Sequence, residues 1–412
     1  MKLKSDFLRE ISIRGFIYQA SDLEGLDKLM SKNKITAYIG FDITSDSLHI
    51  GSLVQLMLLK WLNNYDHKTI ALVGGGTTLV GDPSGKDETR KIMTVGEISN
   101  NTRKITNTFS QFIDLKRDGT IIDNYTWLSE LNYIEFLRDF GSKITLNKML
   151  TYESVKNRLD RQQPLTFLEF NYMLLQAYDF YYLNKNYDCT LQLGGSDQWG
   201  NIINGIDLIK KTLNQKAYAL TSPLMTNSDG SKMGKTAKGA IWLDKEKLSN
   251  YEFYQFWRNI NDEDVDKFLK LFTELDLSEI KKLSNLKGKE KNEAKKILAF
   301  EVTKISRGYE SANEAKEIAD NIFVNNSIDD RIIKYEIKKN DITQSKFSIL
   351  DAIEKLKLSK SRSETKRLIK SKGIKINDEI FDSQDFSLRS YAKISEIKIS
   401  VGKKNIGILK IK

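Results

Sequence analysis

The chain has 412 residues, enough for two or three domains that each bury a sizeable core. Its single cysteine and two histidines exclude an internal disulfide and a metal site built from several histidines. The net charge of +10 suggests a polyanionic partner, while the short apolar runs and the N-terminus MKLKSDFLRE give no membrane span or signal region, so we expect a cytoplasmic protein.

The first elements lead to a candidate anion site. Residues 1–33 predict two amphipathic scaffold helices. Ala37 to Phe41 is a short apolar run that predicts a buried strand, and after a polar turn the apolar spacing becomes helical from about Leu48. A strand that delivers the chain to a helix N-terminus presents unpaired N–H groups where an anion can bind.

His49 and Gly51 lie in that first helical turn. An imidazole can donate to a phosphate oxygen, and a glycine lets a ligand approach the backbone closely. The tripeptide HIG alone is also compatible with an ordinary strand-to-helix turn.

A second strand, Lys68 to Val73, ends at three glycines that begin with Gly74. Strand, helix and strand within one short stretch form a βαβ unit, which predicts a parallel, doubly wound sheet. Ligands of such sheets bind beyond the carboxyl ends of the strands. We therefore expect Asp42, His49 and the Gly74 region on one rim.

Two loops carry cations. The loop Leu79 to Arg90 contains Lys86 but neither a dinucleotide fingerprint nor a Walker pattern. A later glycine-rich loop, which follows a predicted strand Ala217 to Met225, contains Lys232 and Lys235. Each loop could clamp phosphates, or could be a solvated surface loop.

Residues 97–160 predict helices around one strand, Thr120 to Tyr125, and a long helix follows Pro164. One face of that helix presents a phenol, an amide and a carboxylate, which need either partners in the core or a ligand. These residues are Tyr172, Gln176 and Asp179.

The stretch Gln192 to Ile202 repeats the opening device of strand, glycines and new helix. Two glycine-lined strand ends on one rim favour a crevice for a nucleotide or small metabolite. Cys189 begins this apolar strand, so we expect a structural thiol and not a nucleophile.

The C-terminal third divides by composition. Asn250 to about Ile332 predicts helices with aromatic and leucine stripes, and residues 333–346 are polar and resemble a linker. Residues 347–412 carry 16 lysines and arginines against 8 acidic residues, so most of the excess charge lies there. Two short helices and β-strands are expected, with one basic side lined by Ser361, Arg362, Lys366, Arg367 and Lys370.

Five motifs in order now identify a family resemblance: YIGFDITSDSLHIG, GDPSGK, NYMLLQAYD, QLGGSDQWGN and KMGKT. The chain resembles a bacterial-type tyrosyl-tRNA synthetase over its whole length, including an S4-like RNA-binding tail. The resemblance implies a Rossmann-like catalytic domain at 1–246, a helical anticodon-side domain at 247–332, a linker at 333–346 and a tRNA-binding domain at 347–412. It also implies a homodimer with Phe167 near the interface.

The resemblance implies L-tyrosine, ATP with Mg²⁺ and tRNA(Tyr) as substrates, without a protein-held metal. Tyrosine would contact Tyr38, Asp82, Tyr172, Gln176, Asp179 and Gln198. The nucleotide would contact Gly40, Asp42, His49, Gly51, Asp197 and Lys235. The phosphates would be held by Thr44, His49, Lys86, Arg90, Lys232, Lys235 and Thr236.

Two positions depart from the family pattern. Ser52 replaces the second histidine of the HIGH motif, and the KMSKS-type loop reads KMGKT with Gly234. Both lysines of that loop survive, so we expect activity to persist. Two alternatives remain: a tryptophanyl enzyme, which shares the fold, and a non-catalytic paralogue that keeps the RNA-binding tail. Tyr38 and Asp179 favour a phenol over an indole, because an indole offers only a donor.

Overall fold

The computed structural model describes residues 2–83, 93–226, 233, 235–236, 239–323, 333–343, 347–359, 361–383, 385–402 and 405–412, without the side chains of residues 153, 154, 235, 236, 289, 322, 323 and 334. The chain divides into two compact units, Met1–Ala312 and Asn313–Lys412, which are described separately.

The N-terminal unit is built on a six-stranded sheet with the order β1-β6-β5-β2-β3-β4. The strands β2 to β6 are parallel, and β2, β3, β5 and β6 are mostly buried, whereas the edge strand β1 runs antiparallel. The strands are β1 (Gln19–Ala20), β2 (Thr36–Asp42), β3 (Lys68–Gly74), β4 (Gly119–Asp123), β5 (Cys189–Gly195) and β6 (Tyr218–Ser222).

The chain order of the strands creates a switch point. From β2 the sheet grows through β3 to β4 on one side, and then through β5 to β6 on the other. The connections therefore leave β2 and β5 in opposite directions, which opens a crevice beyond their carboxyl ends. The predicted doubly wound parallel sheet is confirmed.

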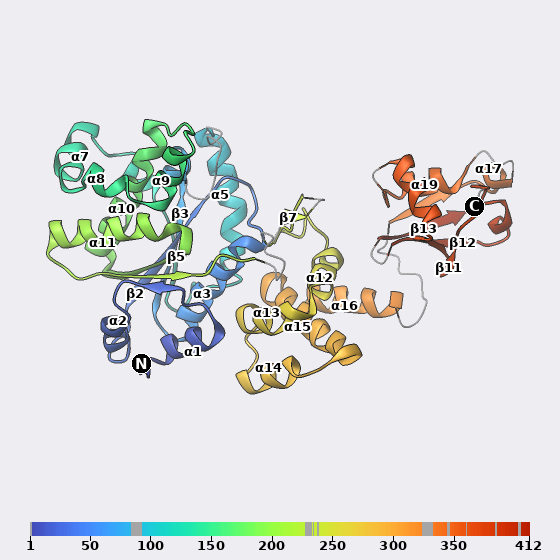
Figure 1. The fold of residues 1–412 in the computed structure, drawn as a ribbon, viewed down its shortest axis with the longest axis horizontal. Coiled ribbons are helices and arrows are strands. Elements are labelled where there is room, and N and C mark those ends of the chain that lie inside the picture. Colours follow the sequence, from blue (N-terminus) through green and yellow to red (C-terminus); the bar gives the residue numbers. More distant parts are fainter. Residues whose placement is uncertain are drawn as a thin grey trace. The chain divides into compact units, whose positions relative to one another are not determined.

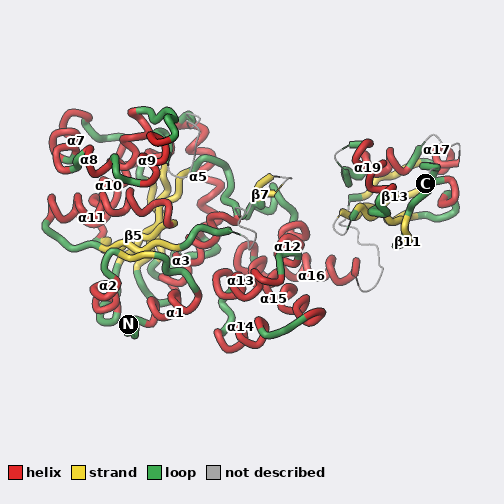
Figure 2. Tube along the Cα trace, in the orientation of Figure 1, coloured by secondary structure: helices red, strands yellow, loops and turns green. Residues whose placement is uncertain are grey.

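Helices cover both faces of this sheet (Figure 1). The helices α10 and α11 lie on one face, where Phe180, Leu183 and Ile209 pack against Tyr38 and Ile70, and α1 and α3 lie on the other. Figure 2 shows the yellow strands between the red helices. The helices are α1 (Asp6–Arg14), α2 (Leu23–Met30), α3 (Leu53–Asn64), α4 (Gly75–Thr78), α5 (Val95–Phe109), α6 (Tyr125–Leu128), α7 (Tyr133–Asp139), α8 (Leu146–Met149), α9 (Glu153–Asp160), α10 (Phe167–Tyr187) and α11 (Trp199–Leu213).

Three predicted boundaries are wrong by a few residues. The helix expected from Leu48 starts as the 3-10 turn Ile50–Ser52 and becomes α-helical at Leu53. The strand β6 stops at Ser222 because the following proline cannot donate to a ladder. The strand β4 stops at Asp123, whose carboxylate accepts a hydrogen bond from the N–H of Tyr125 at 2.9 Å as the chain turns into α6.

The described residues from Asn250 to Phe323 form a helical region, as predicted. Its core surrounds Trp257, whose ring lies 5.3 Å from Phe256, 5.9 Å from Phe268 and 5.2 Å from Phe272 between ring centroids. The elements are a hairpin of β7 (Lys235–Thr236) and β8 (Gly239–Ala240), then α12 (Asn250–Arg258), α13 (Val265–Phe272), α14 (Leu277–Ser284), α15 (Lys291–Arg307) and α16 (Tyr309–Phe323), whose end belongs to the second unit.

The C-terminal unit contains a five-stranded sheet with the order β11-β10-β12-β13-β9, covered by short helices. Its core includes Ile353, Ile369, Ile397 and Leu409. The elements are β9 (Lys334–Ile337), α17 (Lys339–Thr343), α18 (Ile349–Lys355), α19 (Arg362–Lys370), β10 (Ile374–Ile376), β11 (Glu379–Ile380), β12 (Glu396–Val401) and β13 (Asn405–Ile411).

The predicted linker at 333–346 is wrong. Within it, β9 pairs in parallel with β13, and Ile337 and Ile342 are buried in the core of the C-terminal unit. The segment is polar because β9 is an edge strand, and among its described residues Ile337 and Ile342 are buried in that core while Tyr335 packs against it. The sequence alone does not reveal that its partner strand lies about 70 residues later.

Candidate active site

A pocket of about 410 Å³ opens beyond the carboxyl ends of β2 and β5, at the switch point of the sheet. Its wall brings together strand ends, the turn before α3 and one face of α10. Every predicted tyrosine or nucleotide contact whose side chain is described lines it: Tyr38, Gly40, Asp42, Thr44, His49, Gly51, Asp82, Tyr172, Gln176, Asp179, Asp197 and Gln198.

The turn before α3 fixes the imidazole of His49. Nδ1 of His49 accepts a hydrogen bond from the backbone N–H of Gly51 at 2.9 Å. In the neutral ring the hydrogen is then on Nε2, which is the tautomer that can donate to an anion. A Cβ at Gly51 would lie 2.5 Å from Cε1 of the imidazole, so glycine is required here to make room for His49 itself.

Asp42 ends β2 and is held from two directions. Its Oδ1 accepts from the hydroxyl of Thr77 at 2.9 Å, and its Oδ2 accepts from the hydroxyl of Tyr172 at 3.0 Å. A Cβ at Gly74 would lie 2.5 Å from Oδ1 of Asp42, so that glycine gives the carboxylate its space. Asp42 thus links the ends of β2 and β3 to α10.

The polar face of α10 meets the pocket, as the spacing of Tyr172, Gln176 and Asp179 predicted. Each also has a partner in the protein: Oε1 of Gln176, for instance, accepts from Nδ2 of Asn201 at 3.0 Å. These side chains therefore have partners within the protein and also face the cavity, so a role in ligand binding stays a prediction.

Asp179 is a buried carboxylate with two fixed donors. Nε1 of Trp127 donates to its Oδ1 and Nδ2 of Asn124 donates to its Oδ2, both at 2.8 Å. Burial raises the pKa of Asp179 to about 7, although these two donors act in the opposite direction. A carboxylate has about four acceptor sites, so two bound donors leave room for another.

Tyr38 lines the same pocket with a hydroxyl that has no hydrogen-bond partner among the described residues. The side chain is only 1% exposed, and burial raises its pKa well above the usual value, so the phenol stays protonated. A buried hydroxyl without a partner costs free energy. This group is therefore suited to a polar atom of a ligand.

Gln198 lies at the start of α11, and its side-chain amide contacts two carboxylates. Its Nε2 donates to Oδ2 of Asp82 at 2.9 Å and lies 3.4 Å from Oδ2 of Asp197. Its Oε1 accepts from Asn201 at 3.2 Å. The amide therefore orients Asp82 and Asp197 toward the pocket that all three line.

Some predicted residues are not placed, and some lining residues were missed. Lys86, Arg90 and Lys232 lie outside the described residues, and the side chains of Lys235 and Thr236 are not described. Three lining residues, Thr77, Asn124 and Gln192, were not predicted from the sequence, and neither was Trp127, which donates to Asp179. Asn124 follows β4 directly, so the rule about carboxyl strand ends could have found it.

The described residues hold no group of three or more histidine, cysteine or acidic side chains that could bind a metal ion. Within the same residues, no helix has the length and apolarity that a membrane crossing requires. Cys189 is a buried free thiol whose pKa is raised by burial, so it is not an activated nucleophile.

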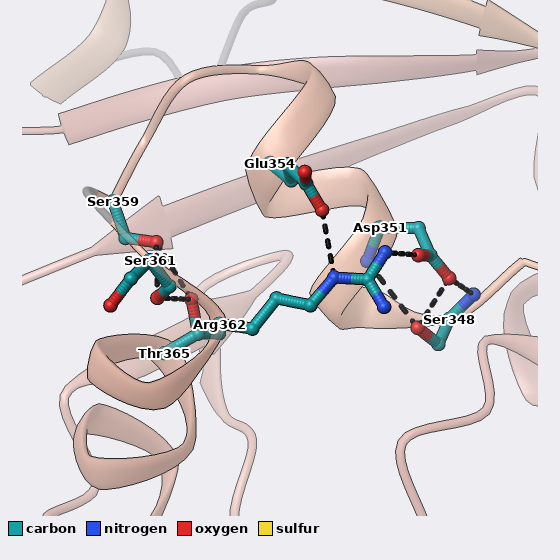
Figure 3. A network of polar contacts seen from close by, with 7 residues as sticks. All are labelled: Ser348, Asp351, Glu354, Ser359, Ser361, Arg362 and Thr365. Atoms are coloured by element: carbon teal, nitrogen blue, oxygen red, sulfur yellow. Dashed lines mark hydrogen bonds and ion pairs between the residues drawn. The ribbon is translucent and has the colours of Figure 1, made fainter.

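The predicted basic side of the C-terminal unit lies on α19, whose lysines and arginines are exposed. Figure 3 shows that two of the five residues also stabilise the unit itself. The hydroxyl of Ser361 accepts from the N–H of Glu364 at 3.2 Å, and Arg362 pairs with Asp351 and with Glu354. The other three are Lys366, Arg367 and Lys370.

The comparisons with known proteins agree with this geometry. The family model described as "tRNA synthetases class I (W and Y)" matches residues 30–324. The chain is 50% identical over 402 residues to a protein of Pelagibacter ubique named tyrosine–tRNA ligase, with 97% of each chain covered. It is 48% identical over 412 residues to a protein of the same name from Bradyrhizobium diazoefficiens, with 99% of each covered.

Among solved structures, a C-terminally truncated mitochondrial tyrosyl-tRNA synthetase of Aspergillus nidulans superimposes with a TM-score of 0.70 at 29% identity. The match covers 77% of this chain and 94% of that one. The relatives of known name thus match the full length of this chain, with its basic C-terminal unit included.

Proposed function

Because the chain belongs to the class I tRNA synthetases of the tryptophan and tyrosine type, we propose that it is a tyrosine–tRNA ligase. It activates L-tyrosine with ATP to tyrosyl-adenylate and pyrophosphate, and then transfers the tyrosyl group to the 3′ end of tRNA(Tyr). The observation that carries the choice of tyrosine is the hydroxyl of Tyr38, which has no hydrogen-bond partner among the described residues and lies in the pocket that also holds the Asp179 carboxylate.

This pair suits a phenol. The substrate hydroxyl donates to Asp179 and accepts from Tyr38, which satisfies both buried groups. Phenylalanine leaves the Tyr38 hydroxyl without a partner and offers no donor to the remaining acceptor sites of Asp179, so its binding is penalised. An indole can donate to Asp179 but cannot accept from Tyr38, which disfavours tryptophan.

The ammonium and carboxyl groups of tyrosine contact other polar side chains of the pocket wall. Asp82, Tyr172 and Gln176 bind the ammonium, and Gln198 lies near the carboxyl group. The substrate carboxylate is ionised at neutral pH, so its attack on the α-phosphorus requires no strong base. The protein's contribution is to orient the two substrates and to stabilise charge on the phosphates.

The nucleotide lies against the turn before α3. Thr44 and the Nε2 donor of His49 hold the triphosphate, Gly40, Asp42 and Gly51 border it, and Asp197 contacts the ribose. Lys86, Arg90, Lys232, Lys235 and Thr236 stabilise the leaving pyrophosphate, and Mg²⁺ arrives with ATP. Lys366, Arg367 and Lys370 bind tRNA phosphates. Ser361 and Arg362 contribute to the same surface, although both also make contacts within the unit.

The protein acts as a homodimer in this proposal. Large apolar side chains are exposed from α7 to the start of α10, which supports an interface with a second copy in this region. They are Tyr133, Ile134, Leu146, Leu150, Leu159, Phe167 and Leu168. Light scattering of the wild type and of Phe167→Glu tests this, with a shift toward monomer expected for the variant.

Tyrosine-dependent exchange of pyrophosphate into ATP tests the activity. We expect exchange with tyrosine, and much less with phenylalanine or tryptophan. Exchange that depends on tryptophan would replace tyrosine as the substrate, and no exchange with any amino acid would favour a non-catalytic RNA-binding paralogue.

A further inference from the structure

Residues 241–248 leave the β7–β8 hairpin and run directly along the His49 turn. The N–H of Ile50 donates to the carbonyl of Ile241 at 2.9 Å, and the N–H of Leu243 donates to the carbonyl of Leu48 at 2.9 Å. His49 and Trp242 form the β-bridge between these bonds, with their rings 6.2 Å apart. The backbone of the 241–248 segment thus fixes the backbone of His49.

The opposite side of this segment is held by one guanidinium from α15. Arg307 donates from Nη2 to the carbonyl of Trp242 at 2.9 Å, from Nε to that of Leu243 at 3.1 Å, and from Nη1 to that of Leu248 at 2.8 Å. Nη1 also lies 3.2 Å from Oδ1 of Asn250, and the guanidinium lies 4.2 Å from the centre of the Phe253 ring. Burial lowers the pKa of Arg307 to about 10, which leaves it protonated at neutral pH.

The same two residues serve both sides. Leu243 donates its N–H to the His49 turn and gives its carbonyl to Arg307, and Trp242 bridges His49 while its carbonyl also binds Arg307. Upstream, this segment continues into β8, which pairs with Lys235 and Thr236 of β7. A shift of the 241–248 segment would therefore move the His49 turn and the β7–β8 hairpin relative to each other.

We propose that Arg307 is a positioning residue for ATP activation, which holds the 241–248 segment so that the His49 turn and the β7–β8 hairpin keep their mutual register. The inference rests on the proposed function, because it assigns both elements to the phosphates. Arg307 does not line the pocket. Its effect is on the nucleotide side and not on the tyrosine side.

The chain offers a matched control in Arg14. This buried arginine donates to the carbonyls of Lys270, Thr273 and Leu275 at 3.2, 3.0 and 2.8 Å, and its guanidinium lies 4.3 Å from the Trp61 ring centre. It joins α1 to the end of α13, near the end of α3 that lies opposite the His49 turn. Both arginines therefore bind carbonyls beside an aromatic ring, but only one of them contacts the 241–248 segment.

The test compares Arg307→Lys and Arg307→Gln with Arg14→Lys and Arg14→Gln in the full-length chain. For Arg307→Gln we expect the kcat of tyrosine-dependent exchange to fall at least about tenfold and the KM for ATP to rise, since a lost bond from a charged donor costs about that factor. The Kd of tyrosine without ATP should stay at the wild-type value. Arg307→Lys, which keeps the charge but not the fork, should lie between wild type and Gln.

The Arg14 variants should lose as much Tm as their Arg307 counterparts and keep wild-type ATP parameters. Two results would overturn the inference: Arg307 variants with lowered Tm but wild-type kcat and KM for ATP, or Arg14 variants with the same kinetic defects. If Arg307→Gln does not fold, the same comparison of Arg307→Lys with Arg14→Lys decides. A wild-type chain without tyrosine-dependent exchange would instead defeat the proposed function.

Discussion

Asp179 shows how one side chain can serve both the fold and the substrate. Its carboxylate is 2% exposed and accepts hydrogen bonds from Trp127 and Asn124, so its position is fixed before any ligand binds. These donors come from the segment after β4, about 55 residues earlier in the chain. In the proposed function, the substrate hydroxyl would therefore meet an acceptor that is already oriented.

Replacing Asp179 by Asn keeps the shape but removes the ionised acceptor and sets an amide donor against Trp127 or Asn124. We expect the preference for tyrosine over phenylalanine in pyrophosphate exchange to fall by about tenfold or more, because a bond to a charged group contributes about 1.5–3 kcal/mol.

The matched control is Asp123→Asn. Asp123 is a partly buried carboxylate with two fixed donors of its own, the backbone N–H groups of Gly75 and Tyr125. It does not line the pocket. Its substitution should lower stability and spare the preference. Equal loss of preference in both variants would contradict the role of Asp179.

His67 predicts a pH dependence of stability at the same scale. Burial is the main cause that lowers its pKa from 6.5 to about 4, and its Nδ1 accepts from the N–H of Ile35 at 3.3 Å. The folded state therefore disfavours the proton that the unfolded state binds below pH 6.5. The stabilising effect of the neutral ring is complete above pH 6.5 and is lost as the pH falls toward 4.

Urea unfolding of wild type and of His67→Gln between pH 7 and pH 4 measures this effect. The free energy of unfolding of the wild type should fall by about 3 kcal/mol more than that of the variant over this range, because the pKa of His67 is 6.5 in the unfolded chain and about 4 in the folded one. Parallel curves for the two proteins would show that His67 does not titrate in this way.

At the scale of elements, α19 carries one cation that is ion-paired within the unit and others that have no ion pair to a described residue. Arg362 forms ion pairs with Asp351 and Glu354 of α18, which join the two helices (Figure 3). Lys366 and Lys370 follow one and two turns later and are exposed. Phosphate contacts are therefore easier for the lysines, which give up no internal ion pair that the structure records.

Lys366→Ala and Lys370→Ala should each weaken tRNA binding and reduce the dependence of log Kd on log salt by about 1, because each removes one phosphate contact. Arg362→Ala should mainly loosen the contact between α18 and α19, at a cost below about 1 kcal/mol for such exposed pairs. Filter binding at several salt concentrations and thermal unfolding measure the two effects. A larger loss of tRNA affinity from Arg362→Ala than from either lysine variant would contradict this division.

At the scale of the whole molecule, the two units predict where the chain can be cut. The pocket lies entirely in the unit Met1–Ala312, and α16 ends at Phe323, before the strand β9 that belongs to the C-terminal sheet. A chain that ends after Phe323 should keep tyrosine-dependent exchange and lose much of its tRNA charging.

A chain that ends after residue 340 is the instructive comparison. It keeps β9 without its partner β13 and exposes Ile337, so we expect it to aggregate more than the shorter chain. Exchange and charging assays, together with light scattering, check both truncated chains. Unchanged charging by the shorter chain would contradict the assignment of the C-terminal unit to tRNA binding.

The sequence by itself determined the strands β2 to β6 of the N-terminal unit, its doubly wound sheet and the rim on which the pocket opens. These follow from local patterns: apolar runs such as Ala37 to Phe41, helical spacing after them, and glycines at strand ends. Tyr172, Gln176 and Asp179 were found because residues three and four apart share one face of a helix.

Only the tertiary structure decided which side chains complete one another. The donors to Asp179, the hydrogen bonds from Arg307 to Trp242 and the place of β9 in the C-terminal sheet each join segments far apart in the chain. No periodicity along the sequence encodes such a pair, because the partner is chosen by how the elements pack in space.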